Sequence, residues 1–272
     1  PHPLTSLVRI DGKTYRLMGG QPEDLPALKQ TSLEVLPTRT LYHFEGAGVA
    51  IEMTFLQPAL PEDIDLMSRP AVYLTWSCVS ADGKPHDVSI YLDAGMEIVV
   101  NDPDQAVVWS RETIEGLDVL KAGSQQQNVL GRKGDDVRID WGYLYLAAAQ
   151  KENSRSGIAS ADACRKGFAS GASIPARLDS QMPRAVRDNA PVLAMQFDLG
   201  PVSSSARTCQ MILAYDDIQS ILYFGRPLSA YWKKDGRQID QILRRRLPIP
   251  QKTPRPAGSL TAVSYTHLTL PT

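Results

Sequence analysis

The sequence predicts a mainly β protein, an antiparallel β-sandwich with one short helix insertion. Along many short segments apolar residues alternate with polar ones, which is the pattern of strands that bury one face. Turn residues recur at intervals of roughly 8–12 residues, which favours a sandwich over a sheet of alternating strands and helices. The convincing helix is one stretch near Ala159–Ser170, where Ser160 or Asp162 is suited to cap the start and Gly171 to end it.

Two hairpins are expected in the first part of the chain. Asp11-Gly12 lies between two apolar runs, which is a strong signal for a two-residue hairpin turn. Gly46-Ala47-Gly48 marks the second turn, and the strand after it alternates apolar and polar residues with a period of two. The strands expected around these turns are Leu4–Ile10, Tyr15–Met18, Arg39–Glu45 and Val49–Leu56.

The longest strand is expected at Val137–Ala149. Its centre, Trp141-Gly142-Tyr143, is interpreted as a bulge, because glycine weakens a strand interior and tolerates the dihedral angles that a bulge needs. The other strands are expected at Val72–Cys78, Val88–Leu92, Val107–Arg111, Leu117–Lys121, Val192–Leu199, Thr208–Tyr215 and Ile218–Phe224.

The composition limits the classes of function. Of 272 residues, 43% are hydrophobic and 22% charged, close to an average globular domain. The formal net charge is −1, so no overall field attracts nucleic acid or anionic lipid, and no nucleic-acid partner is expected. No apolar run approaches the ~18 residues of a membrane span. The odd number of cysteines, 3, excludes a disulfide framework and a four-cysteine zinc site. Three buried free thiols are preferred over one bridge with a spare thiol.

The last part of the chain has a different character. Asp240 begins an amphipathic pattern, which places Ile239, Ile242 and Leu243 on one face of a helix. Three arginines and four prolines follow, and proline removes a helical N–H donor, so no helix is expected to continue there. The final ten residues, VSYTHLTLPT, are similar to a translated sequencing adapter and are expected to be an artefact.

Several blocks of sequence, in order from about Leu4 to Gly236, resemble the N-terminal module of the secreted glutaminase A-like family. The longest is TSLEVLPTRTLYHFEGAGVAIEMTFLQPALPEDIDLMSRPAVYLTW, from Thr31 to Trp76. The similarity lies in the number and order of the blocks, because none of them is a catalytic motif. The others are DGKTYRLMG from Asp11, DGKPHDVSIYLDA from Asp82, GDDVRIDWGYLYLAA from Gly134, DNAPVLAMQFDLG from Asp188 and AYDDIQSILYFGRPLSAYWKKDG from Ala214.

The resemblance implies an organisation and an activity. In that family a β-sandwich module precedes a helical six-hairpin domain, the proteins are exported, and the best-known members hydrolyse L-glutamine to glutamate and ammonia. It therefore implies a secreted, periplasmic or cell-surface location and a C-terminal helical domain of the same parent chain as partner. The expected division is residues 1–236 for the sandwich, 237–262 for a linker or a frameshifted start of the missing helical domain, and 263–272 for the adapter.

The residues of the sandwich offer few candidates for chemistry, and the chain itself is expected to be inactive. No G-x-S-x-G nucleophile motif, phosphate-binding loop or local histidine metal motif is present, and no cofactor or metal is expected. His43 is placed in a strand and His86 in a turn. Asp140, Trp141 and Tyr143 are the candidate binding residues, at an interface or the rim of a cleft for glutamine or a sugar, because an aromatic ring beside a carboxylate suits a polar ligand. The preferred alternative is that such aspartates cap turns and such aromatics fill the core.

Two other functions stay open. A carbohydrate-active parent has the same kind of architecture by analogy, and its sandwich would use tryptophans to stack on sugar rings. A non-catalytic binding module would instead show a strip of exposed aromatic residues on one face. In the leading hypothesis an apolar docking patch is exposed between Ile218 and Trp232. The tryptophans considered for stacking are Trp76, Trp109, Trp141 and Trp232.

Overall fold

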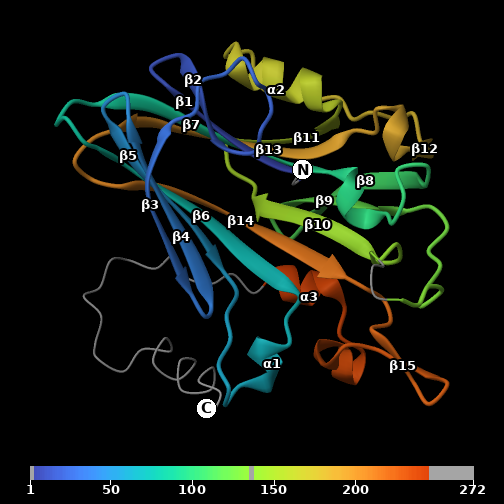
Figure 1. Ribbon diagram of the computed structural model, residues 1–272. Helices are drawn as coiled ribbons and strands as arrows, with labels where there is room; N and C mark the ends of the chain where they lie inside the picture. Colours follow the sequence, from blue (N-terminus) through green and yellow to red (C-terminus); the bar gives the residue numbers. More distant parts are fainter. Residues whose placement is uncertain (1–2, 135–137, 245–272) are drawn as a thin grey trace.

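The computed structural model describes residues 3–134 and 138–244, which form two antiparallel β-sheets packed face to face (Figure 1). The small sheet has five strands in the order β11-β13-β7-β1-β2, and the large sheet has nine in the order β12-β8-β9-β10-β14-β6-β5-β4-β3. The predicted mainly β sandwich is confirmed. The strands of the small sheet are β1 Leu4–Ile10, β2 Lys13–Met18, β7 His86–Gly95, β11 Ser154–Ala159 and β13 Val192–Val202.

The remaining elements complete the large sheet and its connections. Its strands are β3 Lys29–Leu36, β4 Arg39–Gly46, β5 Val49–Leu56, β6 Ala71–Ser80, β8 Ala106–Ile114, β9 Leu117–Ser124, β10 Tyr143–Ala149, β12 Arg184–Ala185 and β14 Arg207–Asp216. A separate two-stranded sheet pairs β15 Ile221–Tyr223 with β16 Arg226–Leu228. The helices are α1 Ile64–Met67, α2 Ala161–Ala169 and α3 Ile239–Arg244, with 3₁₀ turns η1 Met96–Val99, η2 Val186–Asp188 and η3 Tyr231–Gly236.

Both expected hairpin turns form. Asp11 and Gly12 have φ of 49° and 80°, and Ala47 and Gly48 have φ of 49° and 76°. Two consecutive residues with positive φ are the signature of the tight turn that matches the twist of the flanking strands. The Asp-Gly and Ala-Gly dipeptides therefore fix these hairpins locally, and glycine supplies the second position at little steric cost.

The main core lies between the two sheets and follows the alternation that the sequence predicts. Val49, Ile51 and Met53 of β5 are buried, while the residues between them are half-buried. On the small sheet Ile90 and Leu92 of β7 belong to the same apolar cluster. Burying such side chains stabilises the fold by about 1.5–3 kcal/mol each, so the shared core accounts for the sandwich arrangement.

The outer face of the small sheet is covered by α2 (Figure 1). Phe168 of the helix packs on Tyr91, and Ser160 caps the helix by accepting a hydrogen bond from the Ala163 amide at 3.3 Å. Arg165 makes two hydrogen bonds to the fully buried carboxylate of Asp93, at 2.7 and 2.9 Å. The predicted helix is confirmed, and Ser160 is the N-cap.

The outer face of the large sheet is covered by η3 and α3. Trp232, Ile242 and Leu243 form an apolar cluster with side chains of β6, β9, β10 and β14. The amphipathic pattern that predicts a helix around Asp240 is therefore confirmed as far as Arg244. The proline run and the adapter-like end lie outside the described residues, so the assignments of 237–262 and 263–272 stay predictions.

Two strand predictions are wrong. Val137–Ala149 does not form one strand with a bulge: Val137 lies outside the described residues, and β10 begins only at Tyr143. Gly142, with φ of 90°, bends the chain against Asp216, and a Cβ there would collide with the Asp216 carbonyl oxygen. The longest described strand is β13, with 11 residues. Of the strand expected at Ile218–Phe224 only Ile221–Tyr223 forms, outside both large layers.

The three cysteines are in the state that the sequence favours. Cys78, Cys164 and Cys209 are free and buried, as preferred from the sequence. Burial raises the pKa of the Cys78 and Cys164 thiols to about 12. Among the described residues, no helix has the length and apolar character needed to cross a membrane.

Candidate functional site

Asp140, the carboxylate among the candidate residues, is completely buried. Its Oδ2 accepts hydrogen bonds from Arg132 Nε and Gln105 Nε2, both at 2.8 Å, and its carbonyl oxygen accepts one from Ser124 Oγ. Oδ1 has no hydrogen-bond partner among the described residues. Asp140 therefore ties together the segments that precede β10, and its carboxylate is not exposed to solvent.

Trp141 and Tyr143 contact different neighbours. The Trp141 indole N–H donates to the Gln219 carbonyl oxygen at 3.0 Å, and the Trp141 carbonyl accepts from the Tyr215 hydroxyl at 2.8 Å. Tyr143 is half-buried at the start of β10, and the Lys121 ammonium lies 3.9 Å from its ring centroid. The three candidate side chains do not converge on one ligand position in this structure.

Gln219, the partner of Trp141, leads into a segment rich in exposed apolar side chains. Phe224, at the tip of the β15–β16 hairpin, is 88% exposed. Its ring meets that of Tyr223 edge to face at 4.6 Å. The hairpin projects away from both sheets (Figure 1). We call this the apolar hairpin surface; it consists of Ile221, Leu222, Tyr223, Phe224, Leu228 and Tyr231.

The base of the hairpin is held firmly. Lys233 Nζ donates to the Ile218 carbonyl at 2.9 Å and pairs with Asp216, whose Oδ1 also accepts from the Ile218 amide at 2.9 Å. Trp141 holds the next residue, Gln219, so the candidate residues contribute to the base of the surface. The exposure expected between Ile218 and Trp232 is confirmed, whereas docking on it stays a prediction.

Charged residues flank this surface on the same side of the large sheet. Lys234 of η3 pairs with Asp65 of α1 at 2.6 Å, and Arg237 pairs with the same carboxylate at 3.5 Å. The hydrogen bond from Lys234 holds the pKa of Asp65 below its ordinary value. An apolar patch with a charged rim is typical of interaction sites on protein surfaces.

The tryptophans are unavailable for stacking on sugar rings. All four are buried, with exposed fractions of 0% for Trp76, 4% for Trp109, 6% for Trp141 and 1% for Trp232. Trp76 and Trp109 lie in the core between the sheets, and Trp232 lies under α3. The sequence could not separate these roles, because a buried and an exposed tryptophan look the same in one sequence. The expectation of a tryptophan sugar platform is wrong for this structure.

His86 has an environment that sequence analysis missed. It is the first residue of β7, and its Nδ1 lies 2.6 Å from Asp11 Oδ2 while its Nε2 lies 3.0 Å from Asp82 Oδ1. Hydrogen bonds to Asp11 and then to Asp82 raise the pKa of His86 above its ordinary value. Among the described residues, no group of three or more histidine, cysteine, aspartate or glutamate residues has a metal-binding arrangement. The imidazole of His86 thus lies between two carboxylates that favour its protonated form.

Comparisons with known proteins give related chains. Residues 38–247 match the family model described as a domain of unknown function, DUF5127. Glutaminase A from Aspergillus oryzae is 30% identical over 234 residues, which cover 83% of this chain and 33% of the relative. The chain thus spans about a third of the length of the curated relative that it matches.

Solved structures show weaker likenesses. A protein assigned as a kojibiose phosphorylase, from the human microbiome, is 9% identical with a TM-score of 0.39, over 77% of this chain and 21% of that one. A mutant of the heparan sulfate lyase HepC from Pedobacter heparinus is 6% identical with a TM-score of 0.35, over 71% and 22%. These scores do not assign a fold or a function. The match over residues 38–247 assigns the family, and the chain belongs to the DUF5127 domain family.

Proposed function

We propose that this chain is the N-terminal β-sandwich module of an exported glutaminase A-like amidohydrolase, and that it docks on the helical domain of the same parent. The parent would convert L-glutamine to glutamate and ammonia. The 30% identity with glutaminase A over 83% of this chain supports the choice of parent. The exposed apolar hairpin surface is the observation on which the docking role depends.

The hairpin surface has the properties of a docking element. Its apolar side chains face solvent on a short, separate sheet. Its base is nevertheless fixed by Trp141, just before β10, by Asp216 at the end of β14 and by Lys233 of η3. A rigid base lowers the entropy that is lost when the surface becomes ordered on a partner. Leu222 is 60% exposed and Phe224 88% exposed, so covering them would remove two large apolar side chains from water.

Two potentially reactive side chains of the described residues, Cys209 and His86, are poorly suited to catalysis. Amide hydrolysis needs an activated nucleophile or water, an acid for the leaving ammonia and donors for the oxyanion. Burial raises the pKa of the Cys209 thiol well above its ordinary value, which opposes formation of a nucleophilic thiolate. His86 makes hydrogen bonds through both ring nitrogens. We therefore assign catalysis to the rest of the parent protein.

The activity is tested by expressing the intact parent and measuring ammonia release from glutamine over a wide pH range. Release of ammonia supports the substrate assignment. Absence of release at every pH would reject it. Turnover of glycans without turnover of glutamine would favour the carbohydrate-active alternative.

The docking role is tested in the same intact parent by replacing two hairpin residues, Leu222→Asp and Phe224→Asp. Val35→Asp is the matched control, because Val35 is 66% exposed on β3, away from the hairpin. We expect the hairpin variant to separate the thermal unfolding of the two domains and the control to leave it unchanged. Identical unfolding of the two variants would contradict docking through the hairpin.

A further inference from the structure

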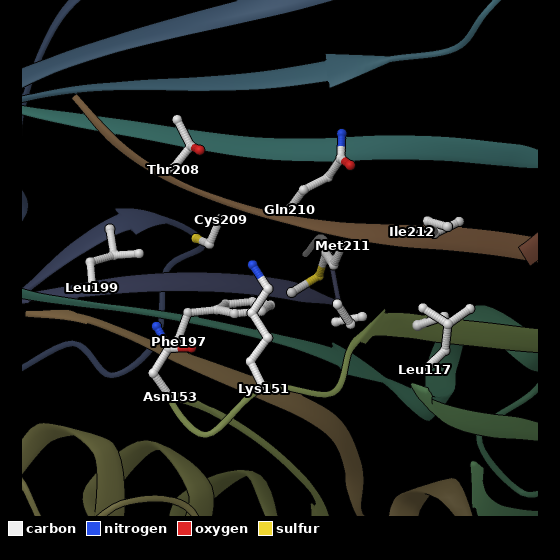
Figure 2. A pocket seen from close by; sticks show the side chains of 13 residues that line it. Leu117, Lys151, Asn153, Phe197, Leu199, Thr208, Cys209, Gln210, Met211 and Ile212 are labelled. Carbon is white, nitrogen blue, oxygen red and sulfur yellow. The ribbon is translucent and has the colours of Figure 1, made fainter. Parts of the chain in front are cut away.

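A cavity opens where the large sheet is incomplete. β10 pairs with β14 only from Met211 to Asp216, whereas β14 continues to Arg207 with β6 alone as its neighbour. Over that stretch the loop from β10 to β11 takes the place of a paired strand. The cavity between this loop and β14 has a volume of about 170 Å³, and Figure 2 shows the side chains around it.

One side of the cavity wall is apolar, whereas Thr208 and Gln210 of β14 contribute polar side chains to the lining. Phe197 and Leu199 of β13 and Cys209 and Met211 of β14 line it, together with Leu117 and Ala148 from the neighbouring strands. Phe197, Leu199 and Cys209 keep 6–7% of their surface exposed although they belong to the core. The cavity therefore gives a ligand from solvent direct contact with the main apolar core.

The side chain of Lys151 places a positive charge at the mouth of the cavity. Lys151 extends from the loop with its amine directed toward Cys209 and Met211 (Figure 2). Its ammonium makes no hydrogen bond or ion pair with any residue in the described ranges. The neighbouring Asn153 is engaged, because its amide donates to the Asp198 carbonyl at 2.8 Å. No carboxylate is among the residues that line the cavity.

We propose that this cavity binds a short-chain fatty acid, with its carboxylate on Lys151 and its hydrocarbon tail between Phe197, Leu199 and Met211. A cation at the rim of an apolar cavity is complementary to a small monoanion with an apolar tail. The size fits, because a cavity of about 150 Å³ is enough for benzene. A free amino acid such as glutamine is a poorer match, since its ammonium group would find no carboxylate here.

The proposal is tested on the 272-residue chain with acetate, butyrate, hexanoate and decanoate at constant ionic strength and neutral pH. Binding is measured by thermal shift and by NMR chemical-shift changes. We expect saturable binding in which each added CH₂ group lowers Kd about threefold to fourfold up to hexanoate. Decanoate should bind no more tightly than hexanoate, because its tail is longer than the cavity can hold. Hexylamine, with the opposite charge, should not bind.

Two variants separate the head-group and tail contributions. Lys151→Met keeps the length of the stem and removes the charge, so we expect Kd for hexanoate to rise at least tenfold. Lys29→Met, on the exposed strand β3, is the matched control and should leave Kd unchanged. Ala148→Leu should abolish binding by filling the cavity.

Three outcomes would overturn the proposal: no saturable binding of hexanoate, equal binding of hexanoate and hexylamine, or an unchanged Kd in Lys151→Met. The last result does not depend on the buried Ala148 variant, because Lys151 lies on the surface and its replacement leaves the core intact. The thermal transition of each variant without ligand shows whether it is folded.

Discussion

The hairpin turns at Asp11-Gly12 and Phe224-Gly225 have the same backbone geometry and opposite surroundings. Their φ angles are 49° and 80° in the first and 46° and 77° in the second. The Asp11 carboxylate accepts hydrogen bonds from His86 and from the Asp87 amide, whereas Phe224 is 88% exposed. The local sequence fixes the turn, and distant residues decide whether the turn holds the domain together or projects from it.

The first of these regions connects the two sheets. His86 of the small sheet lies between Asp11, in the β1–β2 turn, and Asp82, in the β6–β7 connection. The β4–β5 turn of the large sheet completes the group, because the place of a Cβ on Gly48 is occupied by the His86 ring. The hairpin of β15 and β16 instead pairs only with itself. The β1–β2 turn, the β4–β5 turn and the β6–β7 connection thus pack together around His86, whereas the β15–β16 turn does not pack against another turn in this way.

The largest effect is expected from matched glycine substitutions in the two regions. Gly48 and Gly225 have nearly the same φ, 76° and 77°, but an added Cβ meets His86 at Gly48 and open space at Gly225. Gly48→Ala should lower the free energy of unfolding by about 3 kcal/mol, from left-handed strain plus overpacking. Gly225→Ala should cost about 1 kcal/mol or less. Urea unfolding of both variants provides the measurement. Equal losses in the free energy of unfolding would contradict the predicted difference in packing between the two turns.

A smaller effect is expected from pH, and only in the region of His86. The pKa of His86 is raised above its ordinary 6.5, so its contribution to stability is complete below that pH and is lost as the pH rises through the folded value. Hydrogen bonds from His86 lower the pKa of Asp11 below its ordinary 3.8 and that of Asp82 to about 2. The contribution of the aspartates is complete above 3.8 and is lost as the pH falls through their folded values.

The histidine contribution is lost at high pH and the aspartate contribution at low pH. His86, Asp11 and Asp82 therefore stabilise the fold most between about pH 4 and pH 6.5. His86→Asn should remove this stabilisation, so the difference in urea midpoint between the wild type and the variant should be largest in this window and shrink on both sides. His43→Asn is the matched control, because His43 is half-exposed and 3.8 Å from Glu52. A difference in urea midpoint between the wild type and His86→Asn that is the same at all pH values would contradict the assigned pH dependence of His86.

The smallest effect on stability is expected at the tip of the hairpin. Phe224→Asp should change the free energy of unfolding by no more than about 0.5 kcal/mol, because the side chain has little to lose on the exposed tip. The isolated domain is expected to associate through its apolar surface, and this variant should reduce light scattering at high protein concentration. A monodisperse wild type, or a variant that scatters as strongly, would count against the apolar hairpin surface as the cause.

Local signals made most of the fold predictable. Asp11-Gly12 predicts its hairpin because the turn conformation depends on those two residues. The caps of α2 are similarly local, since Ser160 bonds to an amide three residues later. The start of β10 was not predictable, because the residues before it continue the apolar pattern. The bend at Gly142 depends on a carbonyl oxygen of Asp216, far away in the sequence.

The candidate site was less predictable for the same reason. Asp140 beside Trp141 suggests a ligand site, but its burial depends on Arg132 and Gln105, which a pattern does not reveal. The environment of His86 was not predictable either, because one of its two partners, Asp11, lies 75 residues before it, although the other, Asp82, is only four residues away. The exposure of apolar residues between Ile218 and Trp232 was predicted, whereas the β15–β16 hairpin was not, because the run Ile218–Phe224 was expected to be one strand.

The contact between Trp141 and Gln219 makes the hairpin optically observable. We expect the fluorescence of the Trp141 indole to respond when its bond to the base of the hairpin is lengthened or broken. Trp76 and Trp109 lie in the core between the sheets and Trp232 lies under α3. The domain therefore contains its own spectroscopic probe of whatever covers the hairpin, at a position that needs no added label.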